Sequence, residues 1–186
     1  MSDDKAKGRP QFKLVQFLES NGIPIQLARP LLTIGVPEEA FGLYHVAEHL
    51  TVLESPRYHQ IISFGVQGFY NVCFVPETSA VVVEYRYPNG GIASQIVNTT
   101  LEQFNASVLA VYNRFPFDSW DQGNPLDAFD DFDQLNKEWA IAATDLRKVL
   151  QEIDPVSNDP QGFWVSFTED IMIGDYFTRD ILKDYI

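Results

Sequence analysis

One short stretch of the chain has residues whose types and spacing could hold a metal. The sequence HVAEH, residues 45–49, fits the H-x-x-E-H pattern, in which two histidines one helical turn apart bind zinc and a glutamate acts as the base. This chemistry requires a helix and a third ligand. A helix over residues 38–53 would place His45, Glu48 and His49 away from its apolar face, but GLYHV is equally typical of a strand. No downstream glutamate stands out as a third ligand, so we predict no metal and no cofactor, and keep a small zinc hydrolase as an alternative.

A second candidate for chemistry is Cys73, the only cysteine of the chain. It lies between Val72 and Phe74 in a segment typical of a buried strand, where a free cysteine acts as a small hydrophobic residue. The chain has no phosphate-binding loop, no dinucleotide-binding glycine pattern and no G-x-S-x-G motif. We therefore expect Cys73 to be structural and the protein not to be an enzyme.

The sequence DSWDQGNPLDAFDDFDQ, residues 118–134, holds six aspartates and no lysine or arginine. It lacks the D-x-D-x-D-G run and the closing glutamate of a calcium loop. Two interpretations stay open: a solvated linker, or a partner-binding surface in which aromatic side chains interleaved with charges form an anchor with a charged rim. The candidate partner-binding residues are Asp118, Asp121, Asp127, Asp130, Asp131, Phe132 and Asp133.

The negative charge of the chain is concentrated in its C-terminal part. The net charge is −13; residues 1–114 hold ten acidic and eight basic residues, whereas residues 115–186 hold sixteen and five. This balance argues against direct binding to nucleic acid or to an anionic membrane, because phosphate contacts need lysine and arginine. It favours a basic protein partner. The N-terminus has no apolar segment typical of a signal peptide, and with one cysteine we expect a cytoplasmic protein.

The middle of the chain predicts a sheet. Segments 60–65, 69–75, 80–87 and 92–98 are rich in β-branched and aromatic residues. The short connectors between them contain turn residues, so neighbouring strands are expected to pair antiparallel as a meander. In the third strand, Val81, Val83 and Tyr85 alternate with Val82, Glu84 and Arg86. This alternation predicts that the second set lies on a wetter face.

Apolar spacing and capping residues predict helices on both sides of the sheet. The expected helices are residues 10–21, 101–113, 132–154 and about 160–173. Prolines in residues 23–37 predict extended and turning chain there. Trp139 and Trp164 are expected to be buried and to pack the C-terminal helices against the sheet. The fold class is thus α+β, a central antiparallel meander flanked by an N-terminal helix and several C-terminal helices. We expect one domain over residues 1–186, with an acidic linker or insert at about 115–134.

The order of these segments resembles that of a known family. It runs from FLESNGIP and FGLYHV through IISFGVQGFYNVCFVPETSAVVVEY to IVNTTLEQF and LRKVLQEIDPVSNDPQGFW. Over roughly residues 12–167 this is similar to the SUKH superfamily, and within it to the fourth group of SUKH immunity proteins. The family often has threonine-glycine in the turn where this chain has Thr78 and Ser79, so that turn is expected to differ. The acidic insert is also longer than usual.

The resemblance implies an α+β domain without catalytic residues. It implies an immunity protein that binds and neutralises a polymorphic toxin, often a nuclease or a nucleic-acid deaminase, inside the bacterium that makes it. The expected partner is then a basic toxin domain. More divergent members act as regulatory or scaffold binding modules, and this function is the main alternative.

Overall fold

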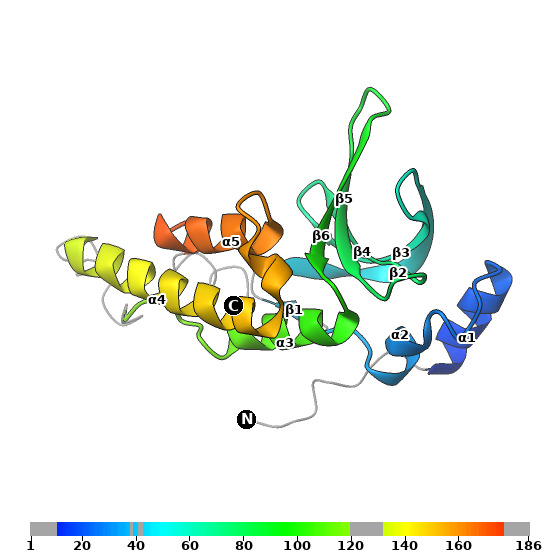
Figure 1. Ribbon diagram of the computed structural model, residues 1–186, viewed down its shortest axis with the longest axis horizontal. Coiled ribbons are helices and arrows are strands. Elements are labelled where there is room, and N and C mark those ends of the chain that lie inside the picture. Colours follow the sequence, from blue (N-terminus) through cyan, green and yellow to red (C-terminus); the bar gives the residue numbers. More distant parts are fainter. Residues whose placement is uncertain (1–10, 38, 41–42, 120–131, 177–186) are drawn as a thin grey trace. The chain divides into compact units, whose positions relative to one another are not determined.

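The computed structural model describes residues 11–37, 39–40, 43–119 and 132–176. The chain divides into two compact units, Met1–Val108 and Leu109–Ile186, and each is considered by itself (Figure 1). That the chain is one domain with an acidic linker or insert stays a prediction, since residues 120–131 lie outside the described ones. None of the helices in the described ranges is both long enough and apolar enough to cross a membrane.

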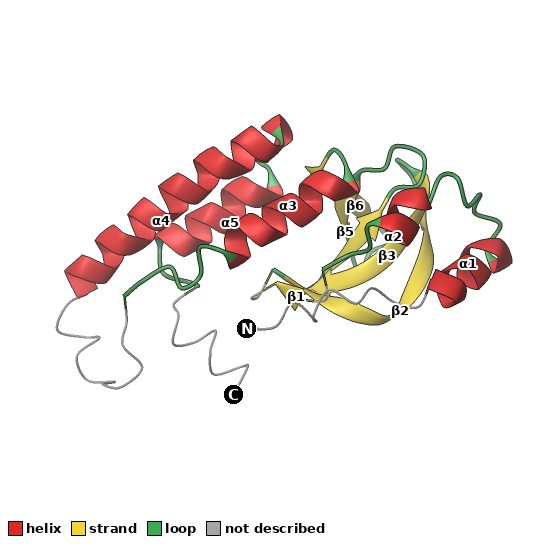
Figure 2. Ribbon diagram, turned by 90° about the horizontal axis from the view of Figure 1, so that it is seen from below, coloured by secondary structure: helices red, strands yellow, loops and turns green. Residues whose placement is uncertain are grey.

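The first unit is built on an antiparallel sheet (Figure 2). Its strand order is β1-β2-β3-β4-β5-β6. The strands are β1 (Glu39–Ala40), β2 (Tyr44–Ser55), β3 (His59–Gln67), β4 (Tyr70–Phe74), β5 (Val81–Arg86) and β6 (Ile92–Asn98). Each strand pairs with the next one along the chain. The meander and the α+β class predicted from the sequence are therefore confirmed. The sheet also gains β1 and the long strand β2, because residues 44–55 are extended rather than helical.

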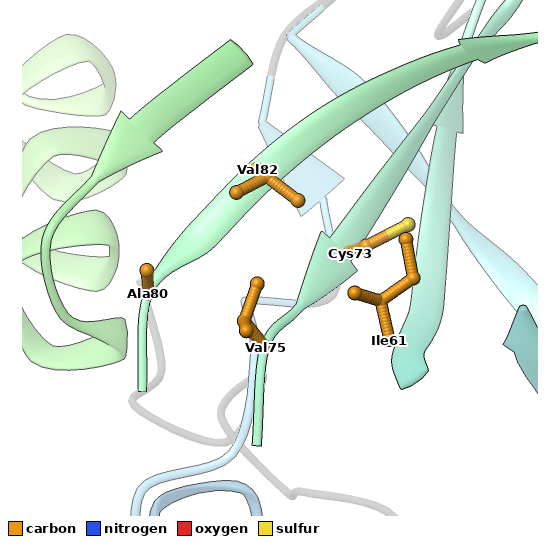
Figure 3. Close-up of a cluster of buried hydrophobic side chains, with 5 residues drawn as sticks. All are labelled: Ile61, Cys73, Val75, Ala80 and Val82. Atoms are coloured by element: carbon orange, nitrogen blue, oxygen red, sulfur yellow. The ribbon is translucent and has the colours of Figure 1, made fainter. Parts of the chain in front are cut away.

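One face of the sheet carries a cluster of buried side chains from three strands and the connector between β4 and β5. Figure 3 shows its members, which are Ile61, Cys73, Val75, Ala80 and Val82. All of them are at most 6% exposed. Leu53, Tyr58 and Ile96 pack against the cluster from its margin.

The prediction of a wetter face on β5 was wrong. Val82 is buried opposite Cys73 of β4, and Glu84 is fully buried, so only Arg86 meets solvent. Arg86 donates a hydrogen bond of 2.7 Å to the carbonyl oxygen of Glu54 on β2, three strands away in the sheet. This contact across the sheet requires the sheet to curl. A curled sheet covers its own concave face, which is why alternation alone misjudged the exposure of this strand.

The opposite face packs on helix α3 (Leu101–Tyr112). The rings of Tyr44, Phe64 and Phe104 meet with centroids 5.7–5.9 Å apart. Tyr44 also donates a hydrogen bond from its hydroxyl to the carbonyl of Pro37. Gly65 makes this packing feasible, since a Cβ there would lie 2.6 Å from the Tyr44 ring. A β-bulge in β3 between Ser63 and Gly65 accompanies the close approach.

The N-terminal segment forms α1 (Gln11–Ser20), as predicted, with Leu18 fully buried. Gly22 follows the helix with φ +68°, the left-handed conformation that ends many helices. The expectation of extended chain over residues 23–37 was wrong in part. A one-turn helix, α2 (Arg29–Thr33), lies there and carries Pro30 in its first turn, where the missing amide costs nothing.

The predicted start of α3 is confirmed. The backbone amide of Gln103 donates to the hydroxyl of Thr100 at 3.2 Å, and the Gln103 side chain accepts from the hydroxyls of Thr99 and Thr100. These bonds occupy polar groups that a helix start leaves free.

The second unit holds two packed helices, α4 (Phe132–Ile153) and α5 (Phe163–Met172), joined through the short 3-10 helix η3 (Pro155–Asn158). Arg147 of α4 donates to the hydroxyl of Thr168 and to the carbonyl of Val165 on α5. Trp139 and Trp164 are 3% and 1% exposed, so their predicted burial is confirmed. Their packing against the sheet stays a prediction.

Candidate partner-binding site

The residues of the HVAEH motif lie on a strand. His45, Glu48 and His49 are exposed along β2, which carries a register shift between Val46 and Thr51. The zinc-hydrolase alternative required these three residues to lie on a helix. They lie on a strand, so that requirement is not met. Among the described residues, no group of three or more histidine, cysteine or acidic side chains is placed to hold a metal ion.

Cys73 is fully buried in the cluster of Figure 3. Burial, with the Glu84 carboxylate as a second cause, raises the pKa of its thiol to about 12. A neutral, inaccessible thiol is a poor nucleophile, because the thiolate is the reactive form. The position is that of a packing residue.

A buried carboxylate escaped the sequence analysis. Glu84 is 0% exposed, and its Oε1 pairs with Nη2 of Arg86 at 2.7 Å. Its Oε2 has no hydrogen-bond partner in the structure. The sequence contains a signal for this ion pair, because Glu84 and Arg86 are two positions apart on one strand and therefore share a face. The pair closes the concave face of the sheet, since Arg86 also holds the carbonyl of Glu54.

The structure describes three of the candidate partner-binding residues. Asp118 is 8% exposed and accepts a hydrogen bond of 3.0 Å from the Trp139 indole, which gives it an internal role. Phe132 begins α4, is 53% exposed and meets the Trp139 ring edge to face. Asp133, next to it, is exposed. The other four, Asp121, Asp127, Asp130 and Asp131, lie outside the described residues.

The described surface of the second unit is nevertheless acidic. Its exposed carboxylates are Asp133, Asp145, Glu152, Asp159, Glu169 and Asp175. Lys137 and Lys148 are exposed among them, and Lys148 pairs with Asp145 at 3.3 Å. Partial burial, together with the nearby charges of Asp175 and Glu169, raises the pKa of Asp170. Arg147 lies 3.9 Å from the Glu169 carboxylate, so this crowding is partly relieved within the unit.

The first unit exposes an aromatic patch, defined here as Phe69, Tyr70, Tyr85 and Tyr87. Phe69, Tyr70 and Tyr87 are 84%, 46% and 47% exposed. Tyr70 of β4 and Tyr85 of β5 are cross-strand partners, with ring centroids 5.4 Å apart, and the Tyr85 and Tyr87 rings lie 4.3 Å apart. The sequence predicts strands for these residues but not their shared surface, although the aromatics beside both turns, in GFY and YRYP, are a visible signal.

Comparison with known proteins supplies one match. A family model described as SUKH-4 immunity protein matches residues 16–170. Comparison with curated proteins and with solved structures gave no match.

Proposed function

Since the chain belongs to the SUKH-4 immunity protein family, we propose that it binds a cognate polymorphic toxin and neutralises it by protein–protein contact. The observation that carries the proposal is the family match, which covers most of the chain. The toxin proposed is a nuclease or a nucleic-acid deaminase, and the complex forms in the cytoplasm of the cell that makes the toxin. The proposal assigns no catalytic residue to this chain, and immunity proteins of this kind are generally not enzymes.

The charge distribution supports a basic toxin domain as the partner. Enzymes that act on nucleic acid bind phosphates through lysine and arginine, and an inhibitor can present carboxylates where the enzyme binds phosphates. Residues 115–186 hold sixteen acidic and five basic residues. Complementary charge speeds the encounter of two proteins. The acidic residues proposed to face the toxin are Asp121, Asp127, Asp130, Asp131 and Asp133, with Phe132 as an aromatic anchor beside them.

The test begins by identifying a toxin domain encoded in a gene that neighbours the gene of this chain, and then measures binding kinetics with that domain. The association rate should fall as salt rises, while the dissociation rate changes little, because salt screens the approach of exposed charges. Changing four aspartates to asparagine should also slow association; these are Asp127, Asp130, Asp131 and Asp133. Phe132→Ala should instead speed dissociation.

The matched control removes the same number of charges elsewhere. Glu19, Glu48, Glu77 and Glu102 are exposed carboxylates of the first unit, and changing them to glutamine alters the net charge equally. This variant should associate faster than the aspartate variant. An association rate indifferent to salt and to the aspartate changes would demote the acidic stretch to a linker. If no toxin domain binds, the regulatory or scaffold module becomes the better account.

A further inference from the structure

The aromatic patch lies at one end of the sheet. In an antiparallel meander, the β3–β4 and β5–β6 turns fall at the same end. Phe69 is in the first of these turns, and Tyr87 directly follows β5 at the second. Figure 1 shows the β5–β6 hairpin projecting well beyond the neighbouring strands. The patch is thus presented outward by two hairpins.

The patch is uncharged, and its three tyrosine rings are fixed in position. Residues 66–71 and 87–92 contain no charged side chain. Gly68 and Gly90 take positive φ, which tight turns require. The Tyr70 and Tyr85 rings are held by strand pairing and the Tyr87 ring by contact with Tyr85, so little conformational entropy is lost when a partner covers these three rings. Phe69 lies in the turn beside them. Exposed aromatic side chains on such a scaffold are typical of the energetic centre of an interface.

The chemistry of the patch indicates a cationic occupant. The faces of aromatic rings carry negative electrostatic potential and attract guanidinium and ammonium groups, and the three phenol hydroxyls can accept hydrogen bonds from them. The cation of this chain nearest in sequence, Arg86, is engaged by Glu84 and by the Glu54 carbonyl. Its neighbour Tyr85 points to the other face of β5, because side chains alternate along a strand, and the Tyr87 ring lies against Tyr85. The net charge of −13 also draws basic surfaces to the protein.

We propose that the aromatic patch is the surface on which the toxin docks, with arginine and lysine side chains of the toxin packed on its rings. This inference rests on the proposed function. It gives the two surfaces different tasks: the acidic residues accelerate the encounter, and the patch holds the complex together. Loss of the patch acts on the dissociation rate, whereas loss of the acidic residues acts on the association rate.

The test uses the full chain and the toxin domain encoded by the neighbouring gene. Phe69→Ala, Tyr70→Ala and Tyr87→Ala are measured singly and combined, and each single change at an anchor should raise the Kd by about thirtyfold. The combined variant should raise it by at least about a hundredfold, through faster dissociation. Tyr70→Phe combined with Tyr87→Phe keeps the rings and should retain most of the affinity. Thermal unfolding of each variant shows whether the fold is intact.

The matched controls are exposed apolar side chains of the second unit. Leu109, Tyr112 and Ile141 are 57%, 43% and 63% exposed, and their combined change to alanine should leave the Kd within about threefold. If the folded patch variant binds the toxin as tightly as the wild-type chain does, the patch is not the docking surface, while the proposed function stands. If the wild-type chain binds no toxin, both proposals fail. If the patch variant instead abolishes self-association of the chain, the patch joins two copies and this inference is overturned.

Discussion

Arg86 compensates for a carboxylate that the fold buries completely. A buried charge is costly unless it is paired, and Glu84 forms an ion pair with Arg86. We expect Arg86→Ala to lower the free energy of unfolding by about 2–3 kcal/mol. This is at or below the usual cost of breaking a buried ion pair, because the arginine side chain is 39% exposed. Glu84→Gln keeps the shape and removes the charge, so its effect should be smaller. Urea denaturation measures both. An Arg86→Ala variant as stable as the wild type would contradict this role.

The buried thiol of Cys73 should make the stability of the protein depend on pH. Its pKa is raised from 9.0 to about 12 in the folded protein, so the folded state keeps the proton that the unfolded state releases. The stability that Cys73 contributes is therefore complete below about pH 9 and is lost as pH rises toward 12, by about 1.4 kcal/mol per pH unit. Cys73→Ala should cost about 1–2 kcal/mol at pH 7 and less at pH 9.5.

The measurement compares urea denaturation of the two proteins between pH 7 and 9.5. It stays below the range in which Tyr44, whose pKa burial also raises, contributes in the same direction. A thiol reagent should label the native protein far more slowly than the urea-unfolded one. Rapid labelling of the folded protein, or a stability difference independent of pH, would show that the thiol is accessible.

The β4–β5 turn shows how a departure from the family pattern is accommodated. Ser79 stands where the family often has glycine, and its φ is +64°. This conformation is costly for a residue with a Cβ. Ser79→Gly should therefore raise the free energy of unfolding by about 1 kcal/mol. The control is Thr78→Gly, which lacks the positive φ and should destabilise the turn. A loss of stability in Ser79→Gly would contradict the conformation of this turn.

The packing of Trp139 against Gly174 in the second unit gives a further prediction about stability. Gly174 follows α5 with φ +84°, and a Cβ there would lie 2.5 Å from the Trp139 ring. Gly174→Ala should therefore cost about 1–2 kcal/mol for the backbone and about 1–3 kcal/mol more for overpacking. Gly22 separates the two effects, since its φ is also positive but no atom lies within 4 Å. If Gly174→Ala and Gly22→Ala lower the free energy of unfolding equally, the Trp139 ring moves aside without measurable cost.

The sequence predicts those elements whose signals are local. The strands from β3 to β6 and the start of α3 follow from β-branched runs, turn residues and the Thr100 cap. It does not predict β2, because GLYHV has no clear period, or α2, because Pro30 is compatible with a first helical turn as well as with extended chain. The burial of Glu84 depends on the curl of the sheet, and the aromatic patch depends on strand register. Neither property can be read from neighbours in the sequence.

At the scale of the whole molecule, charge and aromatic surface lie on different parts of the chain. Residues 115–186 carry most of the net charge, while the exposed patch on the sheet is uncharged. Changes to the acidic residues should therefore alter the association rate, and changes to the patch should alter the dissociation rate. In a double variant that joins the four aspartate changes to the patch changes, we expect the two effects on the Kd to multiply, as they do for sites that share no contact. Effects that fall well short of this product would place both sets of residues in one shared contact.

The central claim is that this chain protects a cell from its toxin by binding it. The most direct measurement is growth of a bacterial host in which the toxin encoded by the neighbouring gene is induced, with and without this chain. We expect that the toxin alone stops growth, that the wild-type chain restores it, and that the two proteins purify together as a stable complex. Growth arrest that is the same with and without the chain, while both proteins are produced and folded, would contradict the account.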